Sequence, residues 1–127
     1  MTREMLRAKV HRITVTERNV EYEGSLTLDA LLMDACGMVP FERIEIYDVD
    51  NGNRFATYAI EGERGGGACC VNGAAAHLVE VGHKLIVASY CALDEAEVPG
   101  HRPRVVLVDS ANRLTAVKDH EGAGVRV

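Results

Sequence analysis

The pair Gly24-Ser25 joins a strand-like segment to an apolar segment, and it is the first place where the chain offers a chemical group in an unusual setting. A serine hydroxyl is a nucleophile when a neighbouring group activates it, and glycine adopts backbone conformations that other residues avoid. Ser25 lies outside any G-x-S-x-G pattern, so a Ser-His-Asp triad is not favoured. Taken alone, the pair is also an ordinary turn.

A basic cluster opens the chain, and its members are Arg3, Arg7, Lys9, His11 and Arg12. The only acidic residue among them is Glu4, although the whole chain has a net charge of −5. Such a cluster could hold a small anion, or it could be a solvated strand.

A second polar group lies in the segment from Arg54 to Ile60. In a strand, period two puts Arg54 and Tyr58 on one face and Thr57 on the other. A guanidinium group binds a carboxylate through two parallel hydrogen bonds, and a phenol can donate a proton. The local alternative is a plain hairpin arm.

Other kinds of site are not favoured. The histidines lack the spacings of a zinc site, so we expect no metal, and Gly65-Gly66-Gly67 does not match a phosphate-binding loop. The four cysteines form no C-x-x-C pair and are best interpreted as free thiols in a reducing compartment. We therefore expect a cytoplasmic protein.

Composition and charge limit the partners. The length of 127 residues and 47% hydrophobic content indicate one domain with an aliphatic core, because Trp is absent and only two Phe are present. The negative net charge argues against nucleic-acid binding. No apolar segment approaches the roughly 18 residues that a membrane span needs.

Strands must position these residues. The pattern predicts a strand over 9–16, with Lys9, His11, Ile13 and Val15 on one face. It predicts a helix over 28–36, with Thr27 as N-cap and Gly37 as C-terminal cap. A hairpin follows over 41–49 and 54–60, then strands over 68–71, 84–90 and 104–108, and a short helix over 74–78. Six or more strands with two small helices indicate a mainly β fold of the compact barrel kind.

At this point the chain resembles the aspartate 1-decarboxylase family. Four segments carry the resemblance, in order and with the family's spacing: KVHR at 9–12, YEGS at 22–25, NGNRFATYAI at 51–60, and ERG at 63–65 followed by VNGAAAHL at 71–78. The similarity covers residues 5 to about 90 and is looser after Cys91.

The resemblance implies a proenzyme that cuts itself between Gly24 and Ser25 into chains 1–24 and 25–127. Ser25 attacks the Gly24 carbonyl, and elimination and hydrolysis then turn Ser25 into a covalently bound pyruvoyl group. Thr57 is implied as the hydroxyl near that carbonyl, and Asn72 as a residue that helps to position it. No metal and no pyridoxal phosphate are implied.

The implied reaction is decarboxylation of L-aspartate to β-alanine and CO2, which supplies pantothenate and coenzyme A biosynthesis. The pyruvoyl group forms a Schiff base with the substrate, and Tyr58 is the proton donor. The implied substrate-binding residues are Lys9, His11, Arg54, Thr57, Gly73, Ala74 and Ala75. Arg54 would hold a carboxylate, and Gly73 to Ala75 would offer backbone N–H groups.

The resemblance further implies a double-psi β-barrel that assembles as a homotetramer, with active sites between neighbouring subunits. Besides the substrate and the other subunits, a protein that assists maturation is a possible partner. Two alternatives stay open at this stage: a non-catalytic barrel that never cuts itself, and a homologue that decarboxylates another acidic amino acid.

Overall fold

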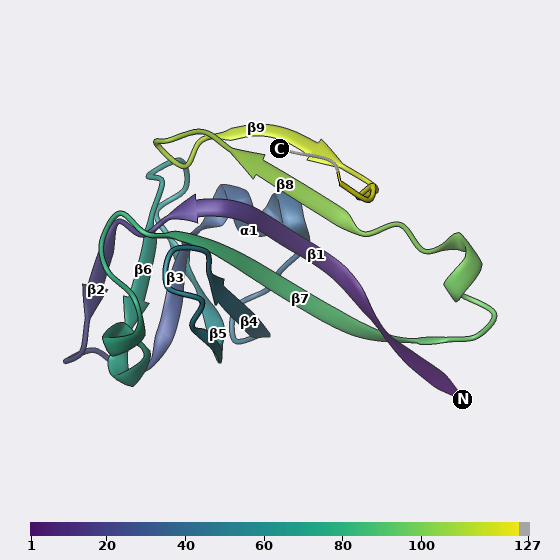
Figure 1. The fold of residues 1–127 in the computed structure, drawn as a ribbon, viewed down its shortest axis with the longest axis horizontal. Helices are drawn as coiled ribbons and strands as arrows, with labels where there is room; N and C mark the ends of the chain where they lie inside the picture. The colour runs from purple at the N-terminus through teal and green to yellow at the C-terminus, as the bar shows by residue number, and fades with distance from the viewer. Residues whose placement is uncertain (125–127) are drawn as a thin grey trace.

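The computed structural model describes residues 1–124, which form a single, mainly β domain with short helices (Figure 1). Residues 125–127, the end of the domain expected over 1–127, lie outside the described residues. The strands are β1 (Thr2–Thr14), β2 (Glu17–Asn19), β3 (Ser25–Asp29), β4 (Arg43–Asp48), β5 (Arg54–Gly62), β6 (Cys69–Asn72), β7 (Lys84–Asp94), β8 (Arg104–Val108) and β9 (Leu114–Lys118). The helices are α1 (Ala30–Cys36) and the 3-10 helices η1 (Gly73–Leu78) and η2 (Val98–Gly100).

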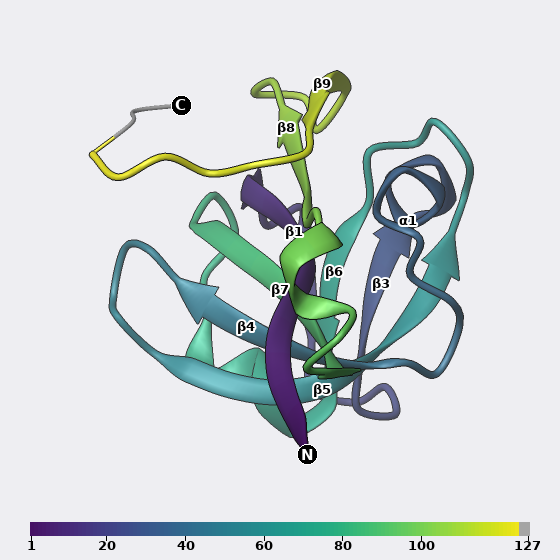
Figure 2. The same cartoon turned by 90° about the vertical axis from the view of Figure 1, so that its right-hand side faces the viewer.

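The strands follow one continuous order, β2-β6-β3-β5-β4-β7-β1-β8-β9. β3 lies between β5, to which it is parallel, and β6, to which it is antiparallel. β1 pairs with β7 along most of its length and runs parallel to β8 on its other edge. Figures 1 and 2 show the long β1–β7 pair crossing the domain, and in Figure 2 β3 and α1 lie to the right of this pair. Two strands, β4 and β7, therefore separate β5 from β1.

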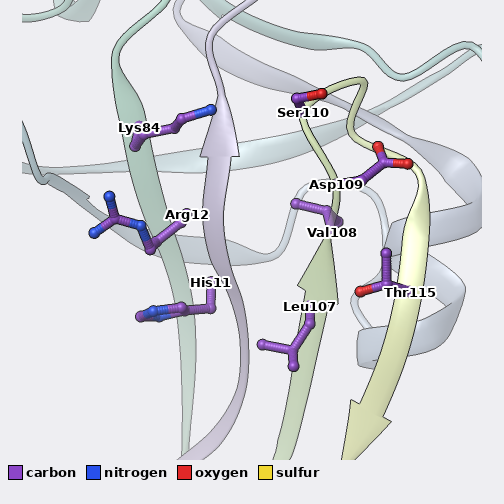
Figure 3. A pocket seen from close by; sticks show the side chains of 8 residues that line it. All are labelled: His11, Arg12, Lys84, Leu107, Val108, Asp109, Ser110 and Thr115. Carbon is purple, nitrogen blue, oxygen red and sulfur yellow. The ribbon is translucent and has the colours of Figure 1, made fainter. Parts of the chain in front are cut away.

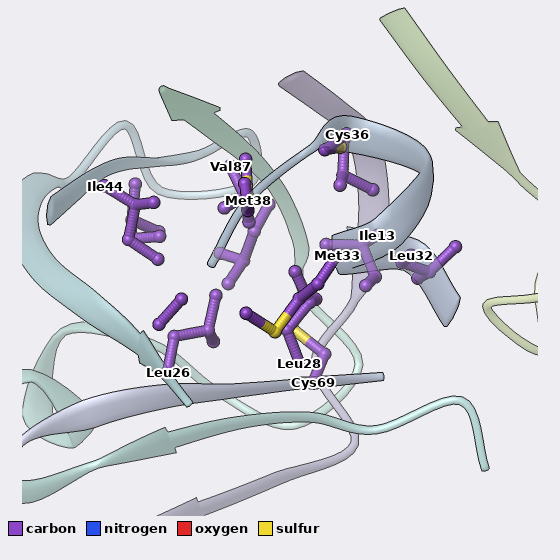
Figure 4. Packing of buried hydrophobic residues seen from close by; sticks show 14 of the residues in the cluster. Ile13, Leu26, Leu28, Leu32, Met33, Cys36, Met38, Ile44, Cys69 and Val87 are labelled. Carbon is purple, nitrogen blue, oxygen red and sulfur yellow. The ribbon is translucent and has the colours of Figure 1, made fainter. Parts of the chain in front are cut away.

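The core is aliphatic, as the composition predicts. Buried side chains from β1, β3, β4 and β7 meet those of α1 and of the segment after it (Figure 4). The labelled members of this cluster are Ile13, Leu26, Leu28, Leu32, Met33, Cys36, Met38, Ile44, Cys69 and Val87. Each large buried side chain contributes about 1.5–3 kcal/mol through removal of apolar surface from water. This burial fixes β3, and with it the position of Ser25.

The face assignment expected for the first strand is wrong. Val10 pairs with Val87 and Ile13 with Leu85, so β1 has one residue more than β7 in this interval. The extra residue is a bulge near Arg12, whose φ is +63°. Because the bulge reverses the alternation, Val10 and Ile13 are both fully buried, whereas Lys9 and His11 lie on the other face with part of their surface exposed.

The predicted start of the first helix is also wrong. Residues 25–29 form β3, and α1 begins at Ala30 with Asp29 as its N-cap, not Thr27. Asp29 Oδ1 accepts hydrogen bonds from Leu31 N (2.9 Å) and Gly65 N (2.8 Å), and Oδ2 accepts one from Gly67 N (2.9 Å). These bonds lower the pKa of Asp29 against the opposing effect of burial, which is the largest contribution. Gly37 caps the other end in the left-handed conformation, as predicted.

The other predicted strands and the short helix are present, whereas β2, β9 and η2 were not predicted. β4 and β5 form the predicted antiparallel hairpin, with Gly52 at φ +78° in the turn. β8 has the predicted bounds, and the short helix is the 3-10 helix η1. The four cysteines are free thiols. None of the helices in the described part of the chain has the length and apolar character that a membrane crossing requires.

Candidate functional site

Ser25 begins β3 and is buried, with 1% of its surface exposed. It pairs with Asn72, the last residue of β6, in the antiparallel register. Asn72 Nδ2 donates a hydrogen bond to Ser25 Oγ (3.1 Å), and Ser25 Oγ in turn donates to Glu23 O (3.4 Å). The hydroxyl is thus held in a desolvated site beside an exposed glycine, Gly24.

The backbone of Gly73 lies directly against Gly24. A Cβ placed on Gly73 would lie 2.6 Å from Gly24 Cα and 2.8 Å from Gly24 N, distances that real Cβ atoms do not adopt. The φ of Gly73 is +73°, which also favours glycine. The segment before Ser25 therefore rests on the start of η1, where only glycine leaves enough space.

Asn72 is held from its other side by a thiol. Cys70 Sγ donates to Asn72 Oδ1 (3.1 Å), which leaves Nδ2 free to donate to both Ser25 Oγ and Thr27 Oγ1 (3.1 Å each). Burial, followed by the Glu17 carboxylate, raises the pKa of Cys70 to about 11, so the thiol keeps its proton. Cys70 was missed by the sequence interpretation, because a single buried cysteine has no distinguishing pattern.

β5, the parallel neighbour of β3, carries Arg54, Thr57 and Tyr58 before the residues that pair with β3. The parallel register pairs Leu26 with Ala59. Continued two residues towards the start of both strands, this register brings Gly24 level with Thr57 and Ser25 level with Tyr58. Within residues 1–124, no side-chain hydrogen bond joins Thr57 to Gly24 or Ser25.

Two tyrosines that the sequence interpretation missed support Arg54. The Arg54 guanidinium lies 4.1 Å from the centre of the Tyr47 ring, its partner across β4 and β5. The hydroxyls of Tyr47 and Tyr90 share a hydrogen bond of 2.8 Å. Burial, followed by this bond, raises the pKa of Tyr47 to about 12. The sequence signal that could have located Tyr47 was the period-two alternation of β4, which puts Tyr47 on the same face as Glu45.

Lys9 and His11 do not lie with the other candidate residues. They are in β1, which β4 and β7 separate from β5. Lys9 forms an ion pair with Glu121, and its side chain is 13% exposed. His11 Nδ1 is buried and has no hydrogen-bond partner within the described residues. Burial, and then the charges of Lys9 and Arg12, lower the pKa of His11 and favour the neutral imidazole.

A pocket of ≈ 290 Å³ adjoins His11 (Figure 3). His11, Arg12 and Lys84 line it from β1 and β7, and side chains of the β8–β9 hairpin line it from the other side. His11 and Arg12, one end of the basic cluster, therefore line a pocket to which Ser25 does not contribute.

One group of possible metal ligands, Asp48, Asp50 and His83, has donor atoms within 4.8 Å of one another. Each has a protein partner. His83 Nδ1 donates to Asp48 Oδ2 (2.8 Å), and Asp48 Oδ1 accepts from Asp50 N (2.8 Å) and Asn51 N (3.2 Å). Asp50 Oδ2 accepts from Lys84 N (2.7 Å). The group therefore shapes the β4–β5 turn, and sequence spacing could not reveal it because His83 is remote from the two carboxylates.

The same turn is tied to η1. Asn51 Nδ2 and Asn53 Nδ2 both donate to Leu78 O, each at 2.9 Å. The hairpin that carries Arg54 is thus joined to the helix that carries Gly73, Ala74 and Ala75.

Comparison with known proteins shows which sequences this chain is similar to. Residues 1–115 match the family model described as "Aspartate decarboxylase". The chain is 52% identical over 118 residues to the aspartate 1-decarboxylase of Bordetella pertussis, which covers 93% of this chain and 97% of that protein. It is 48% identical over 118 residues to that of Caldicellulosiruptor bescii (93% and 92%), and 46% identical over 124 residues to that of Clostridium botulinum (98% of both).

Proposed function

This chain belongs to the aspartate decarboxylase family, and we propose from this premise that it converts L-aspartate to β-alanine and CO2 as a pyruvoyl-dependent carboxy-lyase. The β-alanine supplies pantothenate biosynthesis. The observation that carries the proposal is the buried Ser25 hydroxyl, held by Asn72 against a glycine segment that itself rests on Gly73.

The residues around Ser25 fit a pyruvoyl group. Such a group keeps the main-chain carbonyl of Ser25, turns Cβ into a methyl group and has a ketone oxygen on Cα in place of the amine, so it needs no more space than the serine. Asn72, whose Nδ2 donates to Ser25 Oγ before cleavage, remains a polar donor beside the converted residue. When present, the group withdraws the electrons that remain after the carboxylate of a bound amino acid departs.

The self-cleavage takes place between two adjacent residues of the chain. Ser25 Oγ attacks the Gly24 carbonyl carbon, and the acyl group moves from nitrogen to oxygen, so that an ester replaces the amide. Loss of the Ser25 α-proton then expels residues 1–24 with a terminal carboxylate. Hydrolysis of the resulting dehydroalanine releases ammonia and leaves the ketone on residues 25–127. Gly24 leaves its carbonyl carbon accessible to the hydroxyl because it has no side chain.

The attack puts negative charge on the Gly24 carbonyl oxygen, and Thr57 is the residue proposed to stabilise it. The parallel register, which brings Thr57 level with Gly24, supports this assignment. Asn72 holds the attacking oxygen. Tyr58, level with Ser25, is proposed as the acid that returns a proton to the substrate carbon.

Substrate binding is assigned to positive charge and to backbone donors. Arg54 offers a fork for one carboxylate, and the start of η1, with Gly73, Ala74 and Ala75, offers backbone N–H groups without bulky side chains. Lys9 adds charge, and His11 in its neutral form adds a hydrogen-bonding nitrogen rather than charge.

The separation of Lys9 and His11 from Ser25 supports an assembly of several chains. Within one chain three strands, β5, β4 and β7, lie between β3 and β1, so a complete site requires the β1 face of a second subunit. We assign a homotetramer with active sites between subunits, and a double-psi β-barrel as the finer description of the fold. The free thiols support a cytoplasmic location.

The test combines intact mass with product analysis. Purified protein should separate into chains 1–24 and 25–127, the larger with a blocked, hydrazine-reactive N-terminus, and should release β-alanine from aspartate but not γ-aminobutyrate from glutamate. An unbroken chain that still consumes aspartate, or a cleaved chain that does not, would contradict the proposal.

A further inference from the structure

Phe41 has a backbone conformation that suits glycine or asparagine. Its φ is +71°, and the turn Val39-Pro40-Phe41-Glu42 is closed by a hydrogen bond of 3.1 Å from Glu42 N to Val39 O. Proline at the second position and a positive φ at the third are the features of a type II turn, in which Gly or Asn is favoured at the third position. A bulky residue there strains the backbone.

Burial within the chain does not offset this strain, because Phe41 is 76% exposed. The turn is instead attached to β5 by two backbone hydrogen bonds, from Phe41 N to Ala59 O (2.8 Å) and from Ala59 N to Glu42 O (3.0 Å). Ala59 follows Tyr58 in the chain. The turn thus carries the Phe41 ring to the side of Tyr58.

The two rings are in contact range. Their centroids are 6.3 Å apart and their planes are inclined by 36°. Aromatic pairs attract at centroid distances of about 4.5–7 Å. Tyr58 is half-buried, so a neighbour on one side of its ring restricts the rotation that decides where the hydroxyl points.

We propose that Phe41 is a positioning residue that holds the Tyr58 ring in the orientation required for proton donation. This role rests on the proposed function, in which Tyr58 is the proton donor. The aromatic contact explains why a strained and exposed position of the turn carries phenylalanine, since glycine or asparagine would relieve the strain but leave Tyr58 without its neighbour.

The test is Phe41→Asn, which suits the positive φ and removes the ring. We expect kcat to fall about five- to tenfold, because an aromatic contact is worth about one factor of ten in an equilibrium. The KM for aspartate should stay within about twofold. Self-cleavage should be complete, and the unfolding temperature should stay within about 2 °C or rise, because the strain is relieved. Phe41→Tyr, which keeps the ring, should restore kcat.

A structural measurement avoids the reaction altogether. In the uncleavable Ser25→Ala protein, NMR signals of the Tyr58 ring protons should move when Phe41→Asn removes the neighbouring ring, and should keep their positions in Val39→Thr. Val39 is the matched control because it belongs to the same turn and is 58% exposed. Val39→Thr should also leave kcat unchanged.

The double variant Phe41→Asn/Tyr58→Phe distinguishes failure of this inference from failure of the proposed function. Its kcat should equal that of Tyr58→Phe alone, because Phe41 acts through Tyr58. If Tyr58→Phe keeps full turnover, the proposed proton donor is wrong. If Tyr58→Phe loses turnover but Phe41→Asn does not, only the role of Phe41 fails. A change of molar mass in Phe41→Asn would likewise overturn the proposal, since the ring would then act at a subunit contact.

Discussion

Asn72 Nδ2 lies 3.1 Å from Ser25 Oγ, so the last residue of β6 holds the hydroxyl that begins β3. Both residues are buried, with 4% and 1% of their surfaces exposed. A hydrogen bond in such a site is strong because water does not compete for either partner. The same amide also donates to Thr27 Oγ1, and this second bond fixes the direction in which the first one points.

Asn72→Ala should slow self-cleavage about tenfold, because the attacking oxygen loses a bond worth about 1 kcal/mol and the orientation that comes with it. The intact mass of freshly purified protein, followed over time at fixed temperature, gives the rate. Asn53→Ala is the matched control, since Asn51 still donates to the same Leu78 carbonyl. Equal cleavage rates in Asn72→Ala and the control would contradict the role of Asn72.

Cys70→Ala should slow self-cleavage about fivefold, whereas Cys70→Ser should stay within about twofold of the unchanged protein. The alanine variant loses the donor to Asn72 Oδ1, so the amide is free to turn its Nδ2 away from Ser25. The serine hydroxyl replaces that donor. Rates from intact mass decide the outcome, and unfolding temperatures of both variants show whether general stability has changed. If Cys70→Ala cleaves at the rate of the unchanged protein and Cys70→Ser does not, the thiol has no orienting role.

Much of the scaffold around Ser25 could be predicted, because it depends on local signals. The Asp50–Asn53 turn of the β4–β5 hairpin, the left-handed cap at Gly37 and the bounds of β8 follow from turn chemistry and apolar pattern. The site residues on β3, β5 and β6 were indicated by family motifs, since neither composition nor spacing would bring Ser25 to Asn72.

The errors arose where tertiary structure overrides local pattern. The bulge at Arg12 has no sequence signal, because nothing in a basic residue indicates a positive φ. Asp29 replaces Thr27 as the N-cap because its carboxylate also binds two glycine N–H groups from a distant loop. The distance between Lys9 and Ser25 depends on strand order, which a single sequence does not specify.

Tyr47→Leu should raise the KM for aspartate about three- to tenfold with little change in kcat. The Arg54 guanidinium rests on the Tyr47 ring at 4.1 Å, and a cation–π contact of about 0.5–1 kcal/mol restricts an otherwise mobile side chain. Initial rates over a range of aspartate concentrations separate the two constants. Tyr90→Phe is the control, because it removes only the hydroxyl that bonds to Tyr47 and keeps the ring beneath Arg54. An unchanged KM in Tyr47→Leu would show that Arg54 needs no such support.

The stability of the chain should decrease as the pH rises above neutrality, through His83. The hydrogen bond with Asp48 and then the charges of Asp48, Asp50 and Glu80 raise the pKa of His83 above its usual 6.5, against the opposing effect of its partial burial. Because the folded pKa is the higher one, the contribution is fully present below about pH 6.5 and is lost as the pH rises through the folded pKa. Unfolding temperatures measured between pH 6 and pH 9 should fall more steeply for the unchanged protein than for His83→Gln. The glutamine amide keeps a donor towards Asp48 but cannot gain a charge, so parallel curves for the two proteins would exclude His83 as the titrating group.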